Sequence, residues 1–330
     1  MGTSKSNTNK NLHNASKAKK DEFYTQLEDI SNELRHYKDQ FKDKVVFCNC
    51  DDPNESNFVK YFSQNFEHLG LKKLIATHYK GATLFTNEPS YKIEYEGDKN
   101  NNRMPDPSEF VKVQMKGDGD FRSQECIELL READIVVTNP PFSLFREYVA
   151  QLVEYDKKFL IIGTNNAIHY KEIFPLIQKN RLWLGYNNGP KKYLVPNNYE
   201  GKSVTVIGGK KYMQMGNTSW FTNLDTTKRH EKLVLYKKYS TEQYKQYDNY
   251  DAIEVSKVAD IPLDYEGAMG VPDTFLDKYN PEDFELIGIP FGDLGKILGV
   301  TKNYRGRTDI SVTSNGKTKC PFSRIIIKKK

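Results

Sequence analysis

The sequence predicts an α/β fold with a doubly wound sheet, and three observations support this. Short apolar runs typical of buried parallel strands occur at residues 44–50, 72–78, 133–138 and 158–163. Segments with apolar residues at helical spacing accompany them at 26–40, 55–69, 125–131 and 143–154. Strands that alternate with helices in this way are typical of a doubly wound sheet.

The remaining segments depart from this alternation. Residues 81–110 contain Gly, Asn, Pro and charges, which favours a hairpin or a variable excursion, and a strand is expected at 110–115. The stretch 186–217 has a loop or ribbon composition, rich in Gly, Lys and Asn. A strand returns at 218–224, and another is expected near the basic end of the chain at 320–330.

This pattern suggests three parts. Residues 1–20 form a basic flexible arm that is rich in Lys, Asn and Ser. Residues 21–235 form the main domain, in which 186–217 is a loop-rich insert. Residues 236–330 lack clear alternation of strands and helices and form a separate C-terminal region.

Composition restricts the class of protein without deciding it. A net charge of +5 is compatible with a polyanionic partner, but ordinary cytosolic enzymes have similar values. No apolar run approaches the roughly 20 residues that span a bilayer, and the first residues lack the apolar core of a secretory signal. The four cysteines have no paired spacing, so neither zinc nor a disulfide framework is expected. We therefore expect a cytoplasmic protein with no metal and no membrane segment.

Asn139, Pro140, Pro141 and Phe142 directly follow the apolar run at 133–138. The amide oxygen of Asn139 and the carbonyl of Pro140 could both accept hydrogen bonds from the exocyclic amine of adenine, freeing its lone pair for methylation. Phe142 offers a ring on which an extruded base can stack. The alternative is a plain turn. The end of a parallel strand, where open α/β sheets bind ligands, favours the catalytic interpretation.

Three further segments are candidates for binding a nucleoside cofactor. In Gly117–Phe121, Asp120 could accept from an adenine amine while Phe121 covers the ring, although the string could also be a simple turn or a metal loop. Asn49, Asp51 and Asp52 follow the first strand. A carboxylate there could pair with a ligand ammonium or begin the next helix, and the sequence does not say which Asp does which. Phe23, Tyr24 and Thr25 precede the first helix and could line the same pocket or only start that helix.

Taken together, these strings resemble the EcoRI-type adenine-specific DNA methyltransferase family, a gamma-ordered group of amino-methyltransferases. The resemblance covers most of the chain and rests on DEFYTQ (21–26), NCDDP (49–53), SNF (56–58), GDGDFRS (117–123), DIVVTNPPFSLFREY (134–148), EYDKKFLII (154–162) and DIPLDYEGAMGVPDTFL (260–276).

The resemblance implies a Rossmann-like methyltransferase sheet, S-adenosylmethionine as cofactor, and adenine N6 in a short site of double-stranded DNA as substrate. It implies that Phe23–Thr25 belong to the N-terminal cofactor motif, that Asp120 and Phe121 bind adenosine, and that Asn139–Phe142 are catalytic. A cognate restriction endonuclease that acts on the same site without forming a stable complex is also expected.

The sequence departs from the wider superfamily in two places. The usual glycine-rich first loop is replaced by Cys48–Pro53, and the acidic residue expected after the second strand is missing, because that strand ends in Thr77, His78 and Tyr79. The residue that holds the ribose hydroxyls is therefore open. Two alternatives to DNA methylation are open. RNA-adenine and protein-glutamine methyltransferases share such motifs, so the substrate could be RNA or protein. A DNA-binding protein with an inactive methyltransferase fold is the other alternative.

DNA recognition is expected from segments outside the generic sheet, with residues 236–330 as the target-recognition region. Candidate DNA-binding residues combine phosphate-binding cations with side chains that can address base edges. They are Lys191, Lys192, Lys210, Lys211, Arg305 and Arg307. Arg305 and Arg307 are expected to contact guanine, because the guanidinium fork matches its edge. The alternative for any single lysine is an ordinary solvated surface.

Overall fold

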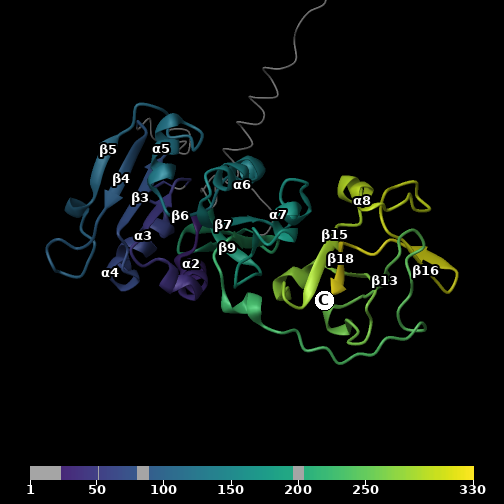
Figure 1. Ribbon diagram of the computed structural model, residues 1–330. Coiled ribbons are helices and arrows are strands. Elements are labelled where there is room, and N and C mark those ends of the chain that lie inside the picture. The colour runs from purple at the N-terminus through teal and green to yellow at the C-terminus, as the bar shows by residue number, and fades with distance from the viewer. Residues whose placement is uncertain (1–23, 51, 80–88, 196–203) are drawn as a thin grey trace, which may run out of the picture. The chain divides into compact units, whose positions relative to one another are not determined.

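The computed structural model describes residues 24–50, 52–79, 89–195 and 204–330 (Figure 1). The predicted basic arm 1–20 and the candidate cofactor residues Phe23 and Asp51 lie outside these ranges.

The chain forms two compact units. The first comprises the chain up to Ala167 together with Gly185–Leu224, and the second comprises Ile168–Leu184 and Asp225–Lys330. The division at Leu224 differs from the sequence-based boundary between residues 235 and 236. No feature of the sequence indicates that Ile168–Leu184 belongs to the second unit.

A large sheet occupies the first unit, with strand order β5-β4-β3-β2-β6-β7-β12. Its strands are β2 (Val45–Cys48), β3 (Lys73–His78), β4 (Tyr91–Tyr95), β5 (Val111–Gln114), β6 (Ile135–Thr138), β7 (Lys158–Thr164) and β12 (Thr218–Thr222). Strands β3, β2, β6 and β7 run parallel. Strands β4, β5 and β12 join antiparallel. The expected α/β class is confirmed as a mixed α/β fold with a parallel centre.

Helices accompany these strands as the apolar spacing predicts. They are α2 (Leu27–Leu34), α3 (Asn57–Gln64), α4 (Phe66–Leu69), α5 (Gln124–Glu132) and α6 (Phe145–Glu154). The helix expected over 26–40 continues after Leu34 as a 3₁₀ helix, Arg35–Gln40. The helix expected over 55–69 is interrupted at Asn65, whose side-chain amide donates to the Tyr61 carbonyl at 2.8 Å.

The parallel strands are apolar because they are buried. Every residue of β2 and β6 is buried, and the core around them includes Phe62, Tyr95 and Trp220. Strand β5 differs, since each of its residues is exposed. It is an antiparallel edge strand, which explains why lysine and glutamine alternate with valine there.

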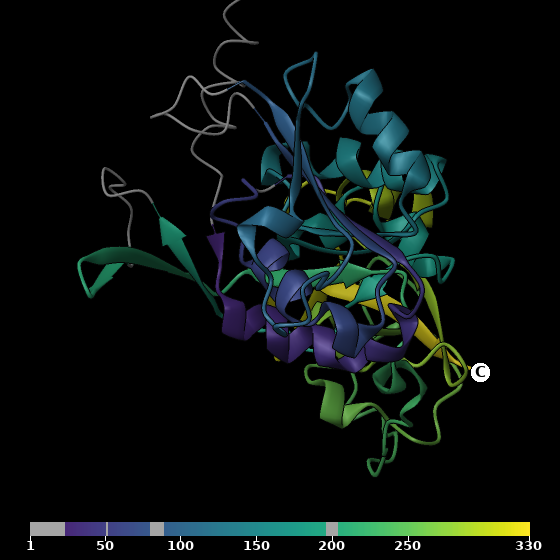
Figure 2. The same cartoon turned by 90° about the vertical axis from the view of Figure 1, so that its left-hand side faces the viewer.

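A second sheet in this unit carries the segment 186–217. It has the order β1-β9-β11-β10, with β1 (Tyr24–Thr25), β9 (Lys191–Val195), β10 (Val204–Ile207) and β11 (Lys210–Met215). The ribbon interpretation of this segment is confirmed for the described residues. In Figure 2 the hairpin of β10 and β11 extends to the left, away from the large sheet.

The second unit is built on a smaller sheet with the order β13-β14-β18-β15. The helices and strands of the second unit, in chain order, are α7 (Phe174–Gln178), β8 (Trp183–Leu184), β13 (Ile253–Glu254), β14 (Met269–Pro272), β15 (Phe284–Gly288), α8 (Gly292–Leu298), β16 (Val312–Ser314), β17 (Lys317–Lys319) and β18 (Arg324–Lys329). Strand β18 confirms the strand expected at 320–330.

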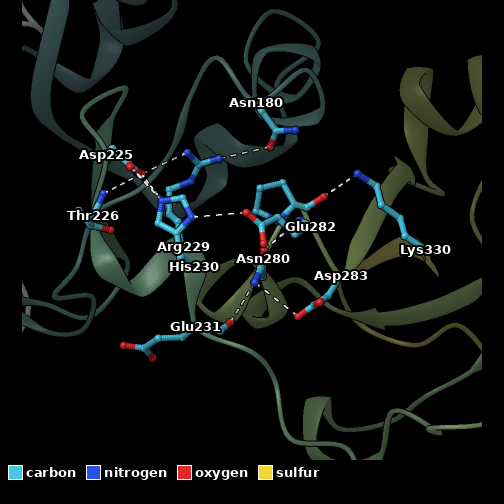
Figure 3. A network of polar contacts seen from close by, with 11 residues as sticks. Asn180, Asp225, Thr226, Arg229, His230, Glu231, Asn280, Glu282, Asp283 and Lys330 are labelled. Carbon is cyan, nitrogen blue, oxygen red and sulfur yellow. Dashed lines mark hydrogen bonds and ion pairs between the residues drawn. The ribbon is translucent and has the colours of Figure 1, made fainter.

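Polar contacts tie distant segments of the second unit together (Figure 3). The His230 ring lies 2.9 Å from an Asp225 carboxylate oxygen, and Arg229 reaches the side-chain oxygen of Asn180 at 3.4 Å. Asn280 donates to the Glu231 carbonyl at 3.4 Å, and the Lys330 amine donates to a backbone carbonyl at 2.5 Å. The segment 168–184, the start of 225–330 and the chain end are therefore joined within one unit.

One close contact fixes the start of α6 against the sheet. A Cβ added at Gly163 in β7 would meet the Phe145 ring at 2.5 Å, and Phe145 also packs edge-to-face on Phe221. Gly163→Ala should therefore lower the free energy of unfolding by about 1–3 kcal/mol, the usual cost of overpacking a core. Chemical denaturation measures this. Gly216→Ala, whose added Cβ would meet nothing within 4 Å, is the matched control. Equal stability of the two variants would contradict the packing argument.

Candidate active site at the carboxyl ends of the parallel strands

The strand order reverses at β2, which pairs with β3 on one side and β6 on the other. Open α/β sheets bind ligands at the carboxyl ends of the strands beside such a reversal. At this edge Asn49 follows β2, His78 ends β3, and Asn139 follows β6. The sheet thus brings together side chains that lie up to 90 residues apart (139 − 49) in the sequence.

The tetrapeptide Asn139–Phe142 is a fixed turn at this edge. Asn139 is only 7% exposed, and Pro140 is buried beside it. The Pro141 carbonyl accepts from the Leu144 amide at 2.9 Å, which starts a 3₁₀ turn that runs directly into α6. Phe142 is half-buried and packs against the core. The Asn139 amide and the Pro140 carbonyl are thus held at the carboxyl end of β6 by a defined backbone turn.

Tyr148 of α6 links three of the sequence motifs. Its hydroxyl donates to Asn49 Oδ1, and its ring meets the Phe121 ring edge-to-face with centroids 5.1 Å apart. Burial raises the pKa of Tyr148 well above its usual value, so the hydroxyl stays neutral and remains a donor. Phe121 is buried by this contact. Its carbonyl also accepts from the Gln151 side chain at 3.1 Å.

The glycine-rich loop 117–120 lies directly on the end of β3. Gly119 has φ +80°, and a Cβ there would stand 2.4 Å from the His78 carbonyl oxygen, so only glycine allows this approach. The Glu125 carboxylate accepts from the Gly117 amide at 2.6 Å and from the Lys116 amide at 3.1 Å. These bonds anchor the loop to the first turn of α5.

Asp120 is held by a neighbouring arginine. Its oxygens lie 2.8 Å from Arg122 Nε and 2.7 Å from Arg122 Nη2. Burial raises the pKa of Asp120, but the hydrogen bonds and charge of Arg122 outweigh it and leave the pKa below its usual value. The carboxylate is therefore ionised and oriented at neutral pH, and it could accept a further hydrogen bond.

Asp52 is buried, and its role differs from that of a helix cap. The N-cap of α3 is Ser56, whose hydroxyl accepts from the amides of Phe58 and Val59. The Asp52 side chain accepts from the Asn54 amide at 3.0 Å, and its second oxygen lies 3.4 Å from Nδ1 of His78. The helix-cap alternative for Asp52 is therefore wrong, because Ser56 takes that position.

Buried polar atoms without a hydrogen-bond partner among the described residues gather at this edge. They are Asn49 Nδ2 after β2, both ring nitrogens of His78 at the end of β3, and Thr138 Oγ1 at the end of β6. Thr25 Oγ1, in β1, is also without one. Buried polar groups in proteins are nearly always hydrogen-bonded, so this gathering needs an explanation. These donors and acceptors fit a polar ligand at the strand ends.

The lysines predicted to bind DNA fall into two groups. Lys192 and Lys210 are exposed and Lys211 is half-buried, all on the β9–β11 ribbon. Lys191 is only 4% exposed. Its amine lies 3.3 Å from the Gly189 carbonyl, and burial lowers its pKa although Asp29 and Glu33 partly oppose this. Lys191 thus has a structural position in this conformation, unlike the exposed one that a phosphate contact requires.

Arg305 and Arg307 lie on an exposed turn of the second unit. Buried Asn303 organises this turn, because its side-chain oxygen accepts from the amides of Arg305 at 2.8 Å and Arg307 at 3.3 Å. The Arg305 guanidinium lies 5.0 Å from the centroid of the exposed Tyr304 ring. Both arginine side chains are exposed, as contact with a macromolecular partner requires.

No helix in the described ranges is long and apolar enough to cross a bilayer. Across the same residues, no group of three or more His, Cys, Asp or Glu side chains could hold a metal ion.

Comparisons with known proteins identify the family. The family model described as "Adenine-specific methyltransferase EcoRI" matches residues 11–330. The chain is 50% identical to the type II methyltransferase M.EcoRI of Escherichia coli, over 98% of this chain and 97% of that protein. It is 39% identical to the type II methyltransferase M.MpnI of Mycoplasma pneumoniae, over 97% and 98% respectively.

A third relative, the type II methyltransferase M.MgeORF184P of Mycoplasma genitalium, is 37% identical over 96% of this chain and 98% of its own length. No solved structure matches the chain. The match over nearly the full length confirms the resemblance that the sequence motifs indicate: the chain belongs to the EcoRI adenine-specific methyltransferase family.

Proposed function

We propose that this protein is a site-specific DNA methyltransferase that transfers a methyl group from S-adenosylmethionine to N6 of adenine. The observation that carries the proposal is the fixed turn Asn139–Phe142 at the reversal of the parallel sheet, in a chain of this family. The type II names of the relatives support a role in or beside a restriction-modification system. A cognate endonuclease acting on the same site and a cytoplasmic location belong to the same proposal.

The chemical problem is the weak nucleophilicity of the target amine, whose lone pair is delocalised into the ring. Asn139 Oδ1 and the Pro140 carbonyl would accept hydrogen bonds from the two N–H groups and favour a pyramidal nitrogen. S-adenosylmethionine would supply an electrophilic methyl group on a sulfonium. As the bond between N6 and the methyl carbon forms, the sulfur–methyl bond would break and leave S-adenosylhomocysteine, and the proton lost from N6 would pass to water.

Adenine must leave the duplex for this reaction, because N6 of a stacked and paired base cannot reach the edge of the sheet. The half-buried ring of Phe142 follows the accepting groups directly and is the proposed platform for the extruded base.

The cofactor would bind at the same strand ends. There Asn49, Asp52 and Asp120 would supply polar contacts, and the buried Phe121 would support the loop. The segment that ends in β1 would line the methionine end. The Asn57 side chain donates to the Thr25 carbonyl at 2.7 Å, which holds β1 to α3 beside the chain that follows β2.

Recognition of the DNA sequence is expected to depend on the exposed turn around Arg305 and Arg307. Arg305→Ala or Arg307→Ala should cost about 1–3 kcal/mol of binding to the cognate duplex and relax the preference at one base pair. Lys192→Ala should instead weaken binding to all sequences and lower the salt slope by about one unit. Binding to cognate and single-mismatch duplexes across salt concentrations separates the two behaviours.

Arg35→Ala, which removes an exposed arginine from a 3₁₀ helix of the first unit, is the matched control for the loss of charge. If both turn variants kept full discrimination between duplexes, base recognition would have to lie elsewhere in the chain.

Purified protein incubated with tritiated S-adenosylmethionine tests the function itself. Transfer of label to duplex DNA, with N6-methyl-2′-deoxyadenosine as the only labelled nucleoside, is the expected result. Transfer to RNA or to a glutamine-containing protein would overturn the substrate assignment. Cofactor binding without transfer to DNA would favour a DNA-binding protein with an inactive fold. Sequencing of modified bases in DNA from cells that express the protein then identifies the site.

A further inference from the structure

The end of β3 carries a buried histidine that the mechanism above does not use. His78 is only 1% exposed, and neither ring nitrogen has a hydrogen-bond partner among the described residues. A buried imidazole in this state loses its hydrogen bonds to water and gains none from the protein, which is costly unless a ligand supplies a partner.

The surroundings of His78 hold the ring in one orientation. The ring stacks on Tyr91, with centroids 4.9 Å apart and planes 18° apart. The Tyr91 hydroxyl accepts from the Asn54 side chain at 2.8 Å, which ties this stack to the turn after β2. On the backbone side, Gly119 of the loop 117–120 lies against the His78 carbonyl. These contacts hold the plane of the imidazole in place.

Asp52 favours one of the two imidazole tautomers. Its carboxylate oxygen lies 3.4 Å from His78 Nδ1 without hydrogen-bond geometry, and the negative charge at this distance stabilises the tautomer with hydrogen on Nδ1. In that tautomer Nε2 has a free lone pair and is a hydrogen-bond acceptor. The Asp52–His78 pair therefore presents an acceptor at the end of β3, as a carboxylate would.

We propose that His78 Nε2 accepts a hydrogen bond from a ribose hydroxyl of the nucleoside cofactor, with Asp52 as the positioning residue. This inference rests on the proposed function for the presence of that cofactor. His78 lies against Asp52 of the turn after β2 through Nδ1 and against Gly119 of the loop 117–120 through its carbonyl, so a nucleoside ligand that contacts both segments would have its ribose beside this ring. Since β3 ends without an acidic residue, this pair is the candidate for holding the hydroxyls.

The test measures the affinity for S-adenosylhomocysteine, which has no methyl group to transfer, so the result does not depend on catalysis. Calorimetry compares S-adenosylhomocysteine with its 2′-deoxy and 3′-deoxy counterparts, on the full-length wild-type protein and on His78→Phe. Phenylalanine keeps a ring on Tyr91 but has no acceptor. We expect loss of one hydroxyl to weaken wild-type binding about 10-fold. His78→Phe should bind the parent compound about 10-fold more weakly and show no further loss with that deoxy analogue.

His68→Phe, which changes an exposed histidine on α4, is the matched control and should keep the wild-type pattern. His78→Gln, which retains an acceptor, should restore part of the discrimination and serves if the phenylalanine variant does not fold. Unchanged discrimination in His78→Phe, or equal wild-type affinity for all three compounds, would overturn the inference alone. No binding of S-adenosylhomocysteine to the wild type would instead count against the proposed cofactor.

Discussion

Asn139→Ala is expected to lower the rate of methyl transfer by on the order of 100-fold or more, while cofactor affinity stays near that of the wild type. The side chain lies in the fixed turn after β6, where under the proposed function it would act on the target amine and not on the cofactor. Loss of one preorganised hydrogen-bonding group in an active site typically costs this much. Single-turnover transfer to duplex DNA and calorimetric titration with S-adenosylhomocysteine measure the two quantities separately.

Asn165→Ala is the matched control for this variant. Asn165 follows β7, the neighbouring parallel strand, and its side-chain oxygen accepts from the Ser219 hydroxyl at 2.7 Å. This variant removes the same side chain from the same edge of the sheet and should keep most of the transfer rate. Near-normal turnover by Asn139→Ala would falsify the assignment of Asn139, whatever the control shows.

Glu33→Ala should lower the free energy of unfolding by about 3–5 kcal/mol, as expected when a buried charged group is removed from its partners. The Glu33 carboxylate is fully buried. It accepts from the Tyr37 hydroxyl at 2.7 Å and from the amides of Tyr186 and Asn187 at 2.6 Å each. Burial raises the pKa of Glu33, and these three hydrogen bonds only partly offset that effect.

Chemical denaturation monitored by circular dichroism measures this effect. Glu28→Ala provides the control, because Glu28 belongs to the same helix α2 but is exposed, and its loss should change stability by less than about 0.5 kcal/mol. A similar small change for Glu33→Ala would show that the carboxylate does not anchor the segment 185–187 that leads into β9.

The parallel centre of the fold could be predicted from the sequence because burial on both faces leaves an apolar run. The runs at 133–138 and 158–163 correspond to β6 and β7 almost residue for residue. The position of the edge strand β5 can be predicted from the sequence, but the exposure of its side chains cannot. Its four residues alternate in polarity, and this pattern is compatible with both half-buried and exposed strands. The change of unit at Ala167 has no sequence signal, because the segment after it resembles an ordinary connection.

The candidate site was predictable only where a single short motif carries its chemistry. Asn139–Phe142 could be located for that reason, and so could Asp120 with Phe121. The contact between Tyr148 and Asn49 joins residues 99 positions apart, and each looks unremarkable in its own segment. The sequence marks His78 only as part of a strand end that lacks the expected acidic residue, and it does not indicate that the ring is buried. Lys191 matched the composition of a phosphate-binding ribbon, but the side chain alternation of β9 turns it inward.

The discontinuity of the second unit limits how it could be exchanged between relatives. A chimera that transplants only residues 225–330 would separate that segment from 168–184. The Arg229 guanidinium, 3.4 Å from the Trp183 ring centroid, would lose its stacking partner. The Gln178 side chain, which donates to the Leu286 carbonyl at 3.0 Å, would face a foreign strand. A graft that moves both segments together keeps these contacts, so exchange of this unit between relatives requires that two separate pieces of chain be replaced at once.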